Sequence, residues 1–265
     1  MITSTSNPLV KRLRKLRYRR FRQTEGVFLV EGIAHVRQAI DHNARFERIF
    51  VSPELLTSEG AWSAIETSRT AGIEVTELGR EAFESIVERD HPSGLGAVVV
   101  MNEVPLTSLV AEPDGVFVGL VDVGNPGNLG SIVRTVDAVG GHGVIVVGES
   151  TDQFHPAAVK ASMGTIFTVP IARAAHMDDL WAWAMMEDIE VVTTSVRGKE
   201  VIWEARLPEP ALYLFGSEAL GLPQEVIDRS DLSVSMPMAG AASSLNLAVA
   251  AGVMLYEVRR RRSPR

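Results

Sequence analysis

The sequence predicts an α/β protein built from two domains. Short apolar runs of strand length alternate with stretches of helical periodicity along most of the 265 residues. A proline-containing stretch, residues 104–114, separates two such series, and a glycine-rich loop follows the first strand of the second series. We therefore expect an N-terminal domain at residues 1–103, a linker at residues 104–114 and a C-terminal domain at residues 115–265.

The N-terminal domain is predicted to open with a helix. Ser6-Asn7-Pro8 is typical of a helix start, and Leu9, Leu13 and Leu16 share the predicted inner face. Strands are then expected at residues 27–30, 46–51, 73–77 and 96–101, and helices at residues 33–41, 59–71 and 80–88.

The first 25 residues are strongly basic. They hold eight Lys and Arg side chains against Glu25, a net charge of +7, so the other 240 residues carry −14 within the total of −7. A basic arm on an acidic body indicates a polyanionic partner, although a solvated basic helix gives the same pattern. Tyr18 and Phe21 lie among the charges, and such rings beside cations suit base stacking and phosphate contact. The candidate contacts are Lys11, Arg12, Lys15, Arg19 and Arg22.

Composition excludes several classes of site. The chain has no cysteine, which rules out disulfides, a thiolate nucleophile and a cysteine-based zinc site. Its six histidines are scattered without ligand spacing, so we predict no metal site. No apolar run approaches the length of a membrane span, and the N-terminus lacks the apolar core of a signal peptide. We expect a cytoplasmic protein that does not contact membranes.

The C-terminal domain is predicted to alternate in the same way. Strands are expected at residues 116–121, 144–147, 190–194, 211–215 and 232–236, with a short one at 167–169. Helices are expected from about residue 131 and at residues 155–163 and 177–188; in the last of these, Trp181 and Met185 should pack in the core. A final helix, capped by Ser243 or Ser244, should run to about residue 261. Its predicted buried residues are Leu245, Val249, Gly252 and Leu255.

Three loops of this domain follow predicted strands and carry small or polar residues. The first spans residues 122–130, the second 216–221 and the third 237–244. The first has G-x-x-G-x-x-G spacing, which disfavours a dinucleotide site; alone it fits a structural turn as well as a ligand loop. Ligands of open α/β sheets bind outside the carboxyl ends of strands, so the three loops are expected to form one cleft. The helix after the first loop should leave Arg134 off its core face.

The residues of these loops fall into three ordered motifs. They are Asn125-Pro-Gly-Asn-Leu-Gly-Ser-Ile-Val-Arg-Thr, Phe215-Gly-Ser-Glu-Ala-Leu-Gly-Leu-Pro, and Met236-Pro-Met with Ser244-Leu-Asn. Together they resemble the SpoU (TrmH-like) RNA ribose 2′-O-methyltransferases of the SPOUT class, and the resemblance covers nearly the whole chain. Ser6-Asn-Pro-Leu-Val-Lys and Gly26-Val-Phe-Leu-Val-Glu-Gly are similar to the RNA-binding domain often fused ahead of that catalytic domain.

The resemblance implies a fold, a cofactor and a partner. The fold would be a C-terminal SPOUT domain with a deep trefoil knot, working as a homodimer, behind a small α/β RNA-binding domain. S-adenosylmethionine would be held largely by backbone groups of the knot. The matching positions are Gly216, Met236 and Leu245, with Leu214 and Met238 beside them. Met236 replaces a more usual isoleucine, a mild departure for a contact made mainly through the backbone.

The resemblance also implies catalytic residues. Arg134 would be the catalytic arginine, surrounded by Asn128, Glu218, Ser244 and Asn246. A guanidinium stays protonated, so we expect Arg134 to hold a phosphate and stabilise a developing oxyanion, with Glu218 or a water as proton acceptor.

Several functions remain open from the sequence. The fused basic domain favours ribosomal RNA as substrate, and transfer RNA is the alternative. A non-catalytic RNA-binding protein of the same fold is a second alternative, which the intact motif residues disfavour. A nucleotide-dependent oxidoreductase is a third, which the glycine spacing disfavours.

Overall fold

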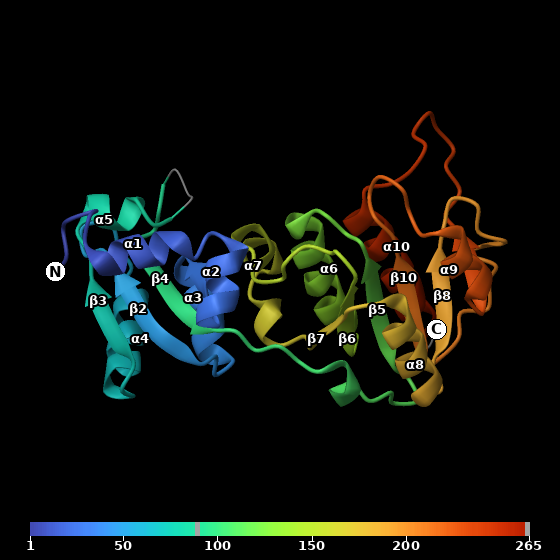
Figure 1. Cartoon of the computed structure of the whole chain (residues 1–265), viewed down its shortest axis with the longest axis horizontal. Helices are drawn as coiled ribbons and strands as arrows, with labels where there is room; N and C mark the ends of the chain where they lie inside the picture. Colours follow the sequence, from blue (N-terminus) through green and yellow to red (C-terminus); the bar gives the residue numbers. More distant parts are fainter. Residues whose placement is uncertain (88–90, 263–265) are drawn as a thin grey trace. The chain divides into compact units, whose positions relative to one another are not determined.

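The computed structural model, which describes residues 1–87 and 91–262, confirms an α/β protein (Figure 1). The chain divides into two compact units. Unit 1 comprises Met1–Asn102 and Asp152–Phe167, and unit 2 comprises Glu103–Thr151 and Thr168–Arg265.

Unit 1 is organised around a mixed four-stranded sheet. Its strands, in the order β1-β4-β2-β3, are β1 (Val27–Glu31), β4 (Leu95–Val100), β2 (Phe46–Val51) and β3 (Glu74–Glu77). Strand β4 runs antiparallel to β1 and β2, and β2 runs parallel to β3. The sheet is buried on both sides, because Val27 and Leu29 of β1 enter one apolar cluster while Phe28 and Val30 enter another.

The helices of unit 1 begin close to the predicted residues. Asn7 caps α1 by accepting a hydrogen bond from the Leu9 N–H at 2.8 Å, as the Ser6-Asn7-Pro8 pattern predicted. The inner residues of α1 are Val10 and Leu13, whereas Leu9 is only half-buried. The helix predicted to reach residue 88 is the short α5, and that predicted end lies outside the described residues. The helices are α1 (Pro8–Lys15), α2 (Arg19–Glu25), α3 (Ile33–Asp41), α4 (Glu59–Thr70), α5 (Arg80–Glu84) and α7 (Pro156–Ser162).

Residues 152–167 were expected in the C-terminal domain but pack within unit 1. The Phe154 ring lies 4.8 Å from the Phe28 ring between centroids, and Val159 joins the same cluster. Asp152 forms a buried ion pair with Arg22 at 2.5 Å. The segment therefore completes one apolar face of the unit 1 sheet. A 3-10 helix at Thr165–Phe167 also overlaps the strand predicted at residues 167–169. The strand lies further along the chain, as β7.

Unit 2 contains a seven-stranded parallel sheet in the order β7-β6-β5-β10-β8-β11-β9. Every residue of β5, β6 and β10 is buried, as expected for strands covered on both faces. The strands are β5 (Val116–Val121), β6 (Gly143–Val147), β7 (Ile171–Ala174), β8 (Glu190–Thr194), β9 (Glu200–Val201), β10 (Ala211–Phe215) and β11 (Leu232–Ser235). The predicted linker contains a short 3-10 helix, Leu106–Ser108.

Four helices complete unit 2: α6 (Pro126–Val139), α8 (Met177–Met186), α9 (Gln224–Arg229) and α10 (Leu247–Arg262). Residues of α8 and α9 belong to the apolar cluster of one face of the sheet, and α6 packs against α10. No helix within the described part of the chain is both long enough and apolar enough to cross a membrane.

Two predictions about these helices were wrong. Helix α6 begins at Pro126 rather than near residue 131, because Asn125 caps it and Gly127 and Gly130 accept helical geometry. The Trp181 side chain is only partly buried, and that of Met185 is 82% exposed, since Leu180, Trp183 and Ala184 form the inner face of α8.

The register of α10 also differs from the prediction. It is capped by Asn246 instead of a serine, and Val249 is 51% exposed. Of the four predicted inner residues only Leu255 is buried. The inner face consists of Leu247, Ala251, Met254, Leu255, Glu257 and Val258.

Candidate active site

The three predicted loops follow β5, β10 and β11. Strand β10 is hydrogen-bonded to β5, and β11 is separated from β10 by β8 alone. Since all of these strands are parallel, their carboxyl ends meet at one edge of the sheet. Hydrogen bonds confirm that the first two loops lie together at this edge, and Asn246, which follows the third loop, is bonded to the first.

Glu218, in the loop after β10, contacts the first turn of α6. Its carboxylate accepts hydrogen bonds from the backbone N–H groups of Gly124 and Asn125, at 3.2 and 3.3 Å. The side-chain amide of Asn128 donates a third at 2.7 Å. A helix N-terminus carries partial positive charge, so this is a favourable position for a carboxylate. The loop after β10 is thereby fixed to the start of α6.

The pKa of Glu218 is lowered by these contacts. Burial opposes ionisation most strongly, but the hydrogen bond from Asn128 and those from the backbone N–H groups of Glu218 itself, Gly124 and Asn125 together outweigh it. Glu218 is therefore an ionised acceptor whose oxygens are already engaged.

Asn128 also joins the third loop to this group. Its side-chain oxygen accepts a hydrogen bond from the amide of Asn246 at 3.2 Å. The Asn246 oxygen caps α10 by accepting from the N–H groups of Ala248 and Val249, at 2.9 and 3.3 Å. Asn128 is buried, so each of its polar groups needs such a partner. Glu218, Asn128 and Asn246 thus form one chain of side chains across all three motifs.

Gly216 is required by close packing at the end of β10. A Cβ atom there would lie 2.1 Å from the Gly221 carbonyl carbon and 2.3 Å from the Leu222 nitrogen, which are both backbone atoms. The loop turns back on itself, since the Gly221 N–H donates to the Ser217 carbonyl at 2.9 Å. This packing buries Gly216, whereas Gly221 is exposed, so the bare backbone that a ligand can reach on this turn is that of Gly221.

The other candidate cofactor residues line the same strand ends. Leu214 is fully buried within β10, between β5 and β8, and its carbonyl accepts from the Thr194 hydroxyl at 3.0 Å. Met236 and Met238 are half-buried, and Leu245 is 36% exposed. These three side chains offer a ligand apolar surface.

Arg134 is exposed on α6 and forms no hydrogen bond or ion pair with any of the residues that the structure describes. It lies six residues after Asn128, about 9 Å along the helix axis and on a different face. Ser244 is likewise exposed, in the loop before α10. Glu218, Asn128 and Asn246 are thus in mutual contact, whereas Arg134 and Ser244 are not joined to them by hydrogen bonds. The guanidinium remains available to an anionic ligand.

Two of the five cations predicted to contact a polyanion are committed to internal pairs. Arg22 is 1% exposed and bound to Asp152, and Arg12 is bound to Glu25 and Glu47, at 2.6 Å each. Lys11, Lys15 and Arg19 are exposed, as predicted. Sequence reasoning placed Arg20 in the basic arm without selecting it, although it too is exposed.

Sequence reasoning also missed two residues of the site. Asn125 caps α6 and donates its N–H to Glu218, and the Asn-Pro pair at a helix start was the available signal. Thr194 binds the β10 backbone, and no sequence signal identified it.

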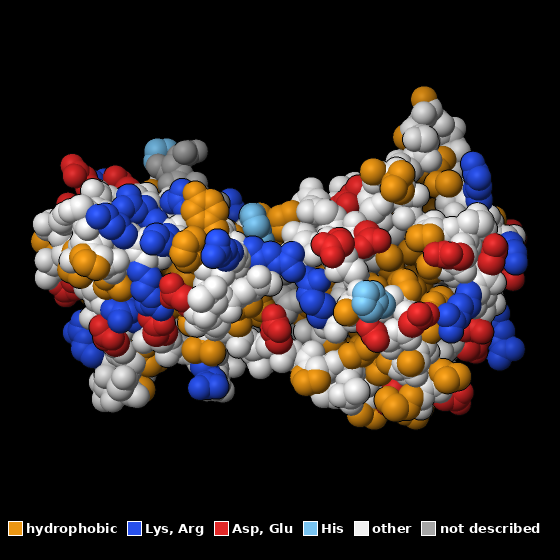
Figure 2. All heavy atoms as spheres, in the orientation of Figure 1, with side chains coloured by type: hydrophobic (Ala, Val, Ile, Leu, Met, Phe, Trp, Pro, Cys, Tyr) orange, Lys and Arg blue, Asp and Glu red, His pale blue; other side chains and the backbone are white. Residues whose placement is uncertain are grey.

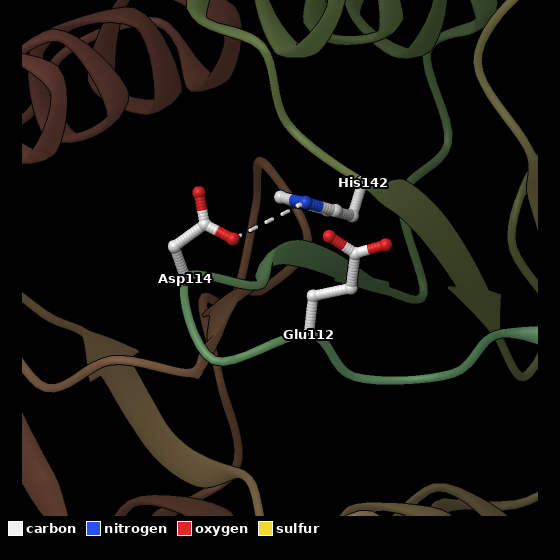
Figure 3. Close-up of side chains that lie close together, drawn as sticks. All are labelled: Glu112, Asp114 and His142. Atoms are coloured by element: carbon white, nitrogen blue, oxygen red, sulfur yellow. Dashed lines mark ion pairs between the residues drawn. The ribbon is translucent and has the colours of Figure 1, made fainter.

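Glu112, Asp114 and His142 lie close together at the other end of β5 (Figure 3). The Val116 N–H donates to His142 Nδ1 at 3.1 Å, so in the neutral ring Nε2 carries the proton. That nitrogen faces Asp114 Oδ1 at 3.9 Å as a donor, not as a metal ligand. We assign no metal to this cluster, and the absence of a metal site stays a prediction.

The SpoU rRNA Methylase family model matches residues 115–256, and the MRM3-like substrate binding domain model matches residues 7–97. A 23S rRNA (uridine(2479)-2′-O)-methyltransferase of Streptomyces viridochromogenes is 33% identical, over 91% of this chain and 85% of that protein. The 23S rRNA (guanosine(2553)-2′-O)-methyltransferase RlmP of Bacillus subtilis is 29% identical, over 97% of this chain and 98% of that protein. An AdoMet-bound rRNA methyltransferase from Sinorhizobium meliloti superposes with a TM-score of 0.90 at 33% identity, over 99% of this chain and 98% of that one.

Proposed function

Because this chain belongs to the SpoU rRNA methylase family, we propose that it transfers a methyl group from S-adenosylmethionine to a ribose 2′-hydroxyl of ribosomal RNA. The observation that carries this proposal is the contact among Glu218, Asn128 and Asn246, which joins all three motif loops at the carboxyl ends of the strands. The similar rRNA 2′-O-methyltransferases cover nearly the whole chain, and this favours ribosomal RNA over transfer RNA.

The residues at the strand ends fit the cofactor. The exposed Gly221 offers bare backbone beside the buried Gly216, and Met236, Met238 and Leu245 add apolar surface for the adenine ring. When bound, S-adenosylmethionine supplies an electrophilic methyl group on a sulfonium. The chain contributes the positioning of that group and of the sugar hydroxyl.

Arg134 acts on the substrate side of the reaction. Its guanidinium stays charged, so it holds a phosphate beside the target ribose and stabilises the oxyanion that develops on the 2′-oxygen. Glu218 keeps α6 and the loop after β10 in place. Its lowered pKa and its three hydrogen bonds make it a weak base, so we assign the proton of the hydroxyl to a water molecule.

The two units have different roles, RNA binding and methyl transfer. Unit 1 is the RNA-binding domain, which the match of residues 7–97 to a substrate binding domain supports. Residues 115–265 are the methyltransferase domain, and the basic arm makes RNA binding salt-dependent. The enzyme works in the cytoplasm, in accord with a chain that has no cysteine.

We further propose that the C-terminal domain contains a deep trefoil knot and functions as a homodimer. The exposed side of α10 supports the dimer. Val249, Val253 and Tyr256 lie at i, i+4 and i+7, and the first and last are 51% and 56% exposed. Sedimentation should give twice the mass of the 28.8 kDa chain, and Val249→Glu should give a monomer. A monomeric wild-type protein at micromolar concentration contradicts the dimer.

Methyl transfer tests the function directly. Purified protein is incubated with methyl-labelled S-adenosylmethionine and either ribosomal or transfer RNA, and the RNA is digested to nucleosides for mass spectrometry. We expect label in a 2′-O-methyl nucleoside from ribosomal RNA. Label in transfer RNA alone supports the alternative substrate. RNA binding without any transfer supports a non-catalytic RNA-binding protein.

A further inference from the structure

The eight cations of the N-terminal arm fall into two groups. Four are engaged within the protein: Arg12 and Arg22 form ion pairs with carboxylates, and Arg14 and Arg17 donate to backbone carbonyls. The other four are exposed and form no ion pair or hydrogen bond through their side chains within residues 1–87 and 91–262. We call these four the basic face: Lys11, Lys15, Arg19 and Arg20. Figure 2 shows Lys and Arg side chains gathered over α1 and α2, with hydrophobic atoms among them.

Tyr18 lies within the basic face, at the turn between α1 and α2. It is the N-cap residue of α2, and its side chain is 59% exposed. The Phe21 ring lies 6.5 Å away between centroids, tilted by 55°. Lys15 Nζ lies 5.3 Å from the Phe21 ring centroid, so cation and aromatic ring are in contact there.

Arg22 stabilises the turn that carries Tyr18 through hydrogen bonds to the backbone. The guanidinium of Arg22 donates to the carbonyls of Leu16 and Arg17, at 2.8 and 2.6 Å, and to Asp152. The backbone of Tyr18 is itself bonded, since its N–H donates to the Lys15 carbonyl at 3.0 Å and its carbonyl accepts from Phe21 at 3.0 Å. An exposed ring on so constrained a backbone loses little freedom on binding.

The exposed cations and the exposed Tyr18 ring together favour binding of unpaired RNA. Cations bind the phosphates of any nucleic acid, but an exposed ring can stack only on a base that is not already stacked inside a duplex. Lysines at i and i+4, such as Lys11 and Lys15, have Cβ atoms roughly 5–6 Å apart and can follow a backbone. We propose that Tyr18 stacks on an unpaired base of the RNA substrate while the basic face holds the adjacent phosphates. This inference rests on the proposed function in taking the ligand to be RNA.

Tyr18→Ala and Tyr18→Phe test the inference in the full-length protein. The probes are a ten-nucleotide single-stranded RNA and a duplex of the same length, with binding followed by fluorescence anisotropy. We expect the wild type to prefer the single strand. Tyr18→Ala should weaken single-strand binding about 5- to 140-fold, the equivalent of ~1–3 kcal/mol for one stacked base. Tyr18→Phe should bind within about twofold of the wild type, since the ring is retained.

Charge variants separate stacking from phosphate contact. Lys11→Ala should weaken both probes and reduce the slope of log Kd against log salt by about one, whereas Tyr18→Ala should leave that slope unchanged. Arg69→Ala is the matched control, because Arg69 is an exposed cation of the same unit that pairs with Glu66 at 2.8 Å. Equal binding of the single strand by the wild type and Tyr18→Ala overturns the inference, as does a wild-type preference for the duplex.

Binding of S-adenosylmethionine, measured by calorimetry on the same samples, keeps the two proposals distinct. Failure of the wild type to bind the cofactor contradicts the proposed function and leaves the stacking result intact. An unchanged thermal unfolding curve of Tyr18→Ala, with both units unfolding as in the wild type, shows that the variant is folded. A loss of single-strand binding in that folded variant then supports the stacking role.

Discussion

At the scale of single residues, Glu218 shows why an acidic side chain in a site need not be its base. Three N–H donors from the start of α6 fill its oxygens and lower its pKa. A carboxyl whose pKa is lower in the folded state stabilises that state above its unfolded pKa, and this stabilisation is lost as the pH falls through the folded value. Around neutral pH the contact is fully present, and the lowered pKa makes the ionised Glu218 a poor acceptor for a proton.

Glu218→Gln should therefore reduce activity without moving its pH dependence. The amide keeps one acceptor but loses the charge, so hydrogen bonds worth ~1.5–3 kcal/mol each are weakened. We expect kcat/KM to fall roughly tenfold or more. The pH–rate profile between pH 6 and 9 should keep its shape. A fall in the wild-type rate at the acidic end of the profile that disappears in the variant would identify Glu218 as the base and contradict its positioning role.

Gly216→Ala should abolish cofactor binding. The added Cβ atom would lie 2.1 Å from the backbone of Gly221, which cannot move as a side chain would. Gly240→Ala is the matched control, because no atom lies within 4 Å of a Cβ atom there. Thermal unfolding should show a large loss of stability for the first variant and a change within about 0.5 kcal/mol for the second. Equal stability of the two would contradict the close packing at Gly216.

The sequence alone does not show which arginines of the basic arm are exposed and which form internal ion pairs. Arg12, Arg19 and Arg22 have the same charge within a few residues of one another, yet one is exposed and two are paired. The partner of Arg22 is Asp152, 130 positions further along the chain. Local pattern identifies a basic arm, but only the tertiary fold decides which cations remain available.

At the scale of elements, the strands were predicted best. The limits of β2, β5, β8 and β10 agree with the sequence prediction at both ends, because short apolar runs bounded by polar residues leave little choice. The starts of two helices, α6 and α10, were predicted less well. Helix α6 begins within the apparent loop, since glycines at its start look like turn residues in the sequence. In α10 the first ten residues are nearly all apolar, which hides the inner face.

The joining of residues 152–167 to unit 1 depends on the Arg22–Asp152 pair. Arg22→Met leaves Asp152 buried without its counter-ion, which should cost about 3–5 kcal/mol of stability. Arg22→Met combined with Asp152→Asn should recover part of that loss. Arg19→Met, on the exposed side of the same helix, should change stability by less than about 0.5 kcal/mol. Denaturant unfolding gives these values, and equal effects of Arg22→Met and Arg19→Met would contradict the role of the pair.

At the scale of the whole molecule, three ordered motifs in the amino-acid sequence suffice to predict the family. Their loops do meet, through Asn128 and its contacts with Glu218 and Asn246. The division of the chain was harder to predict, because a segment that follows β6 packs with the sheet of unit 1. The contact among the motifs was therefore easier to predict than the division of the chain, since the motifs lie at strand ends and no local pattern marks residues 152–167 as part of unit 1.

Arg134→Lys tests the central claim, that a guanidinium serves the reaction at a site built by three loops. The variant keeps the charge but loses the planar pair of donors that binds a phosphate. Single-turnover methyl transfer should fall by a factor of about 100 or more, while the Kd for S-adenosylmethionine stays within about twofold. Near-normal turnover in Arg134→Lys would contradict the account.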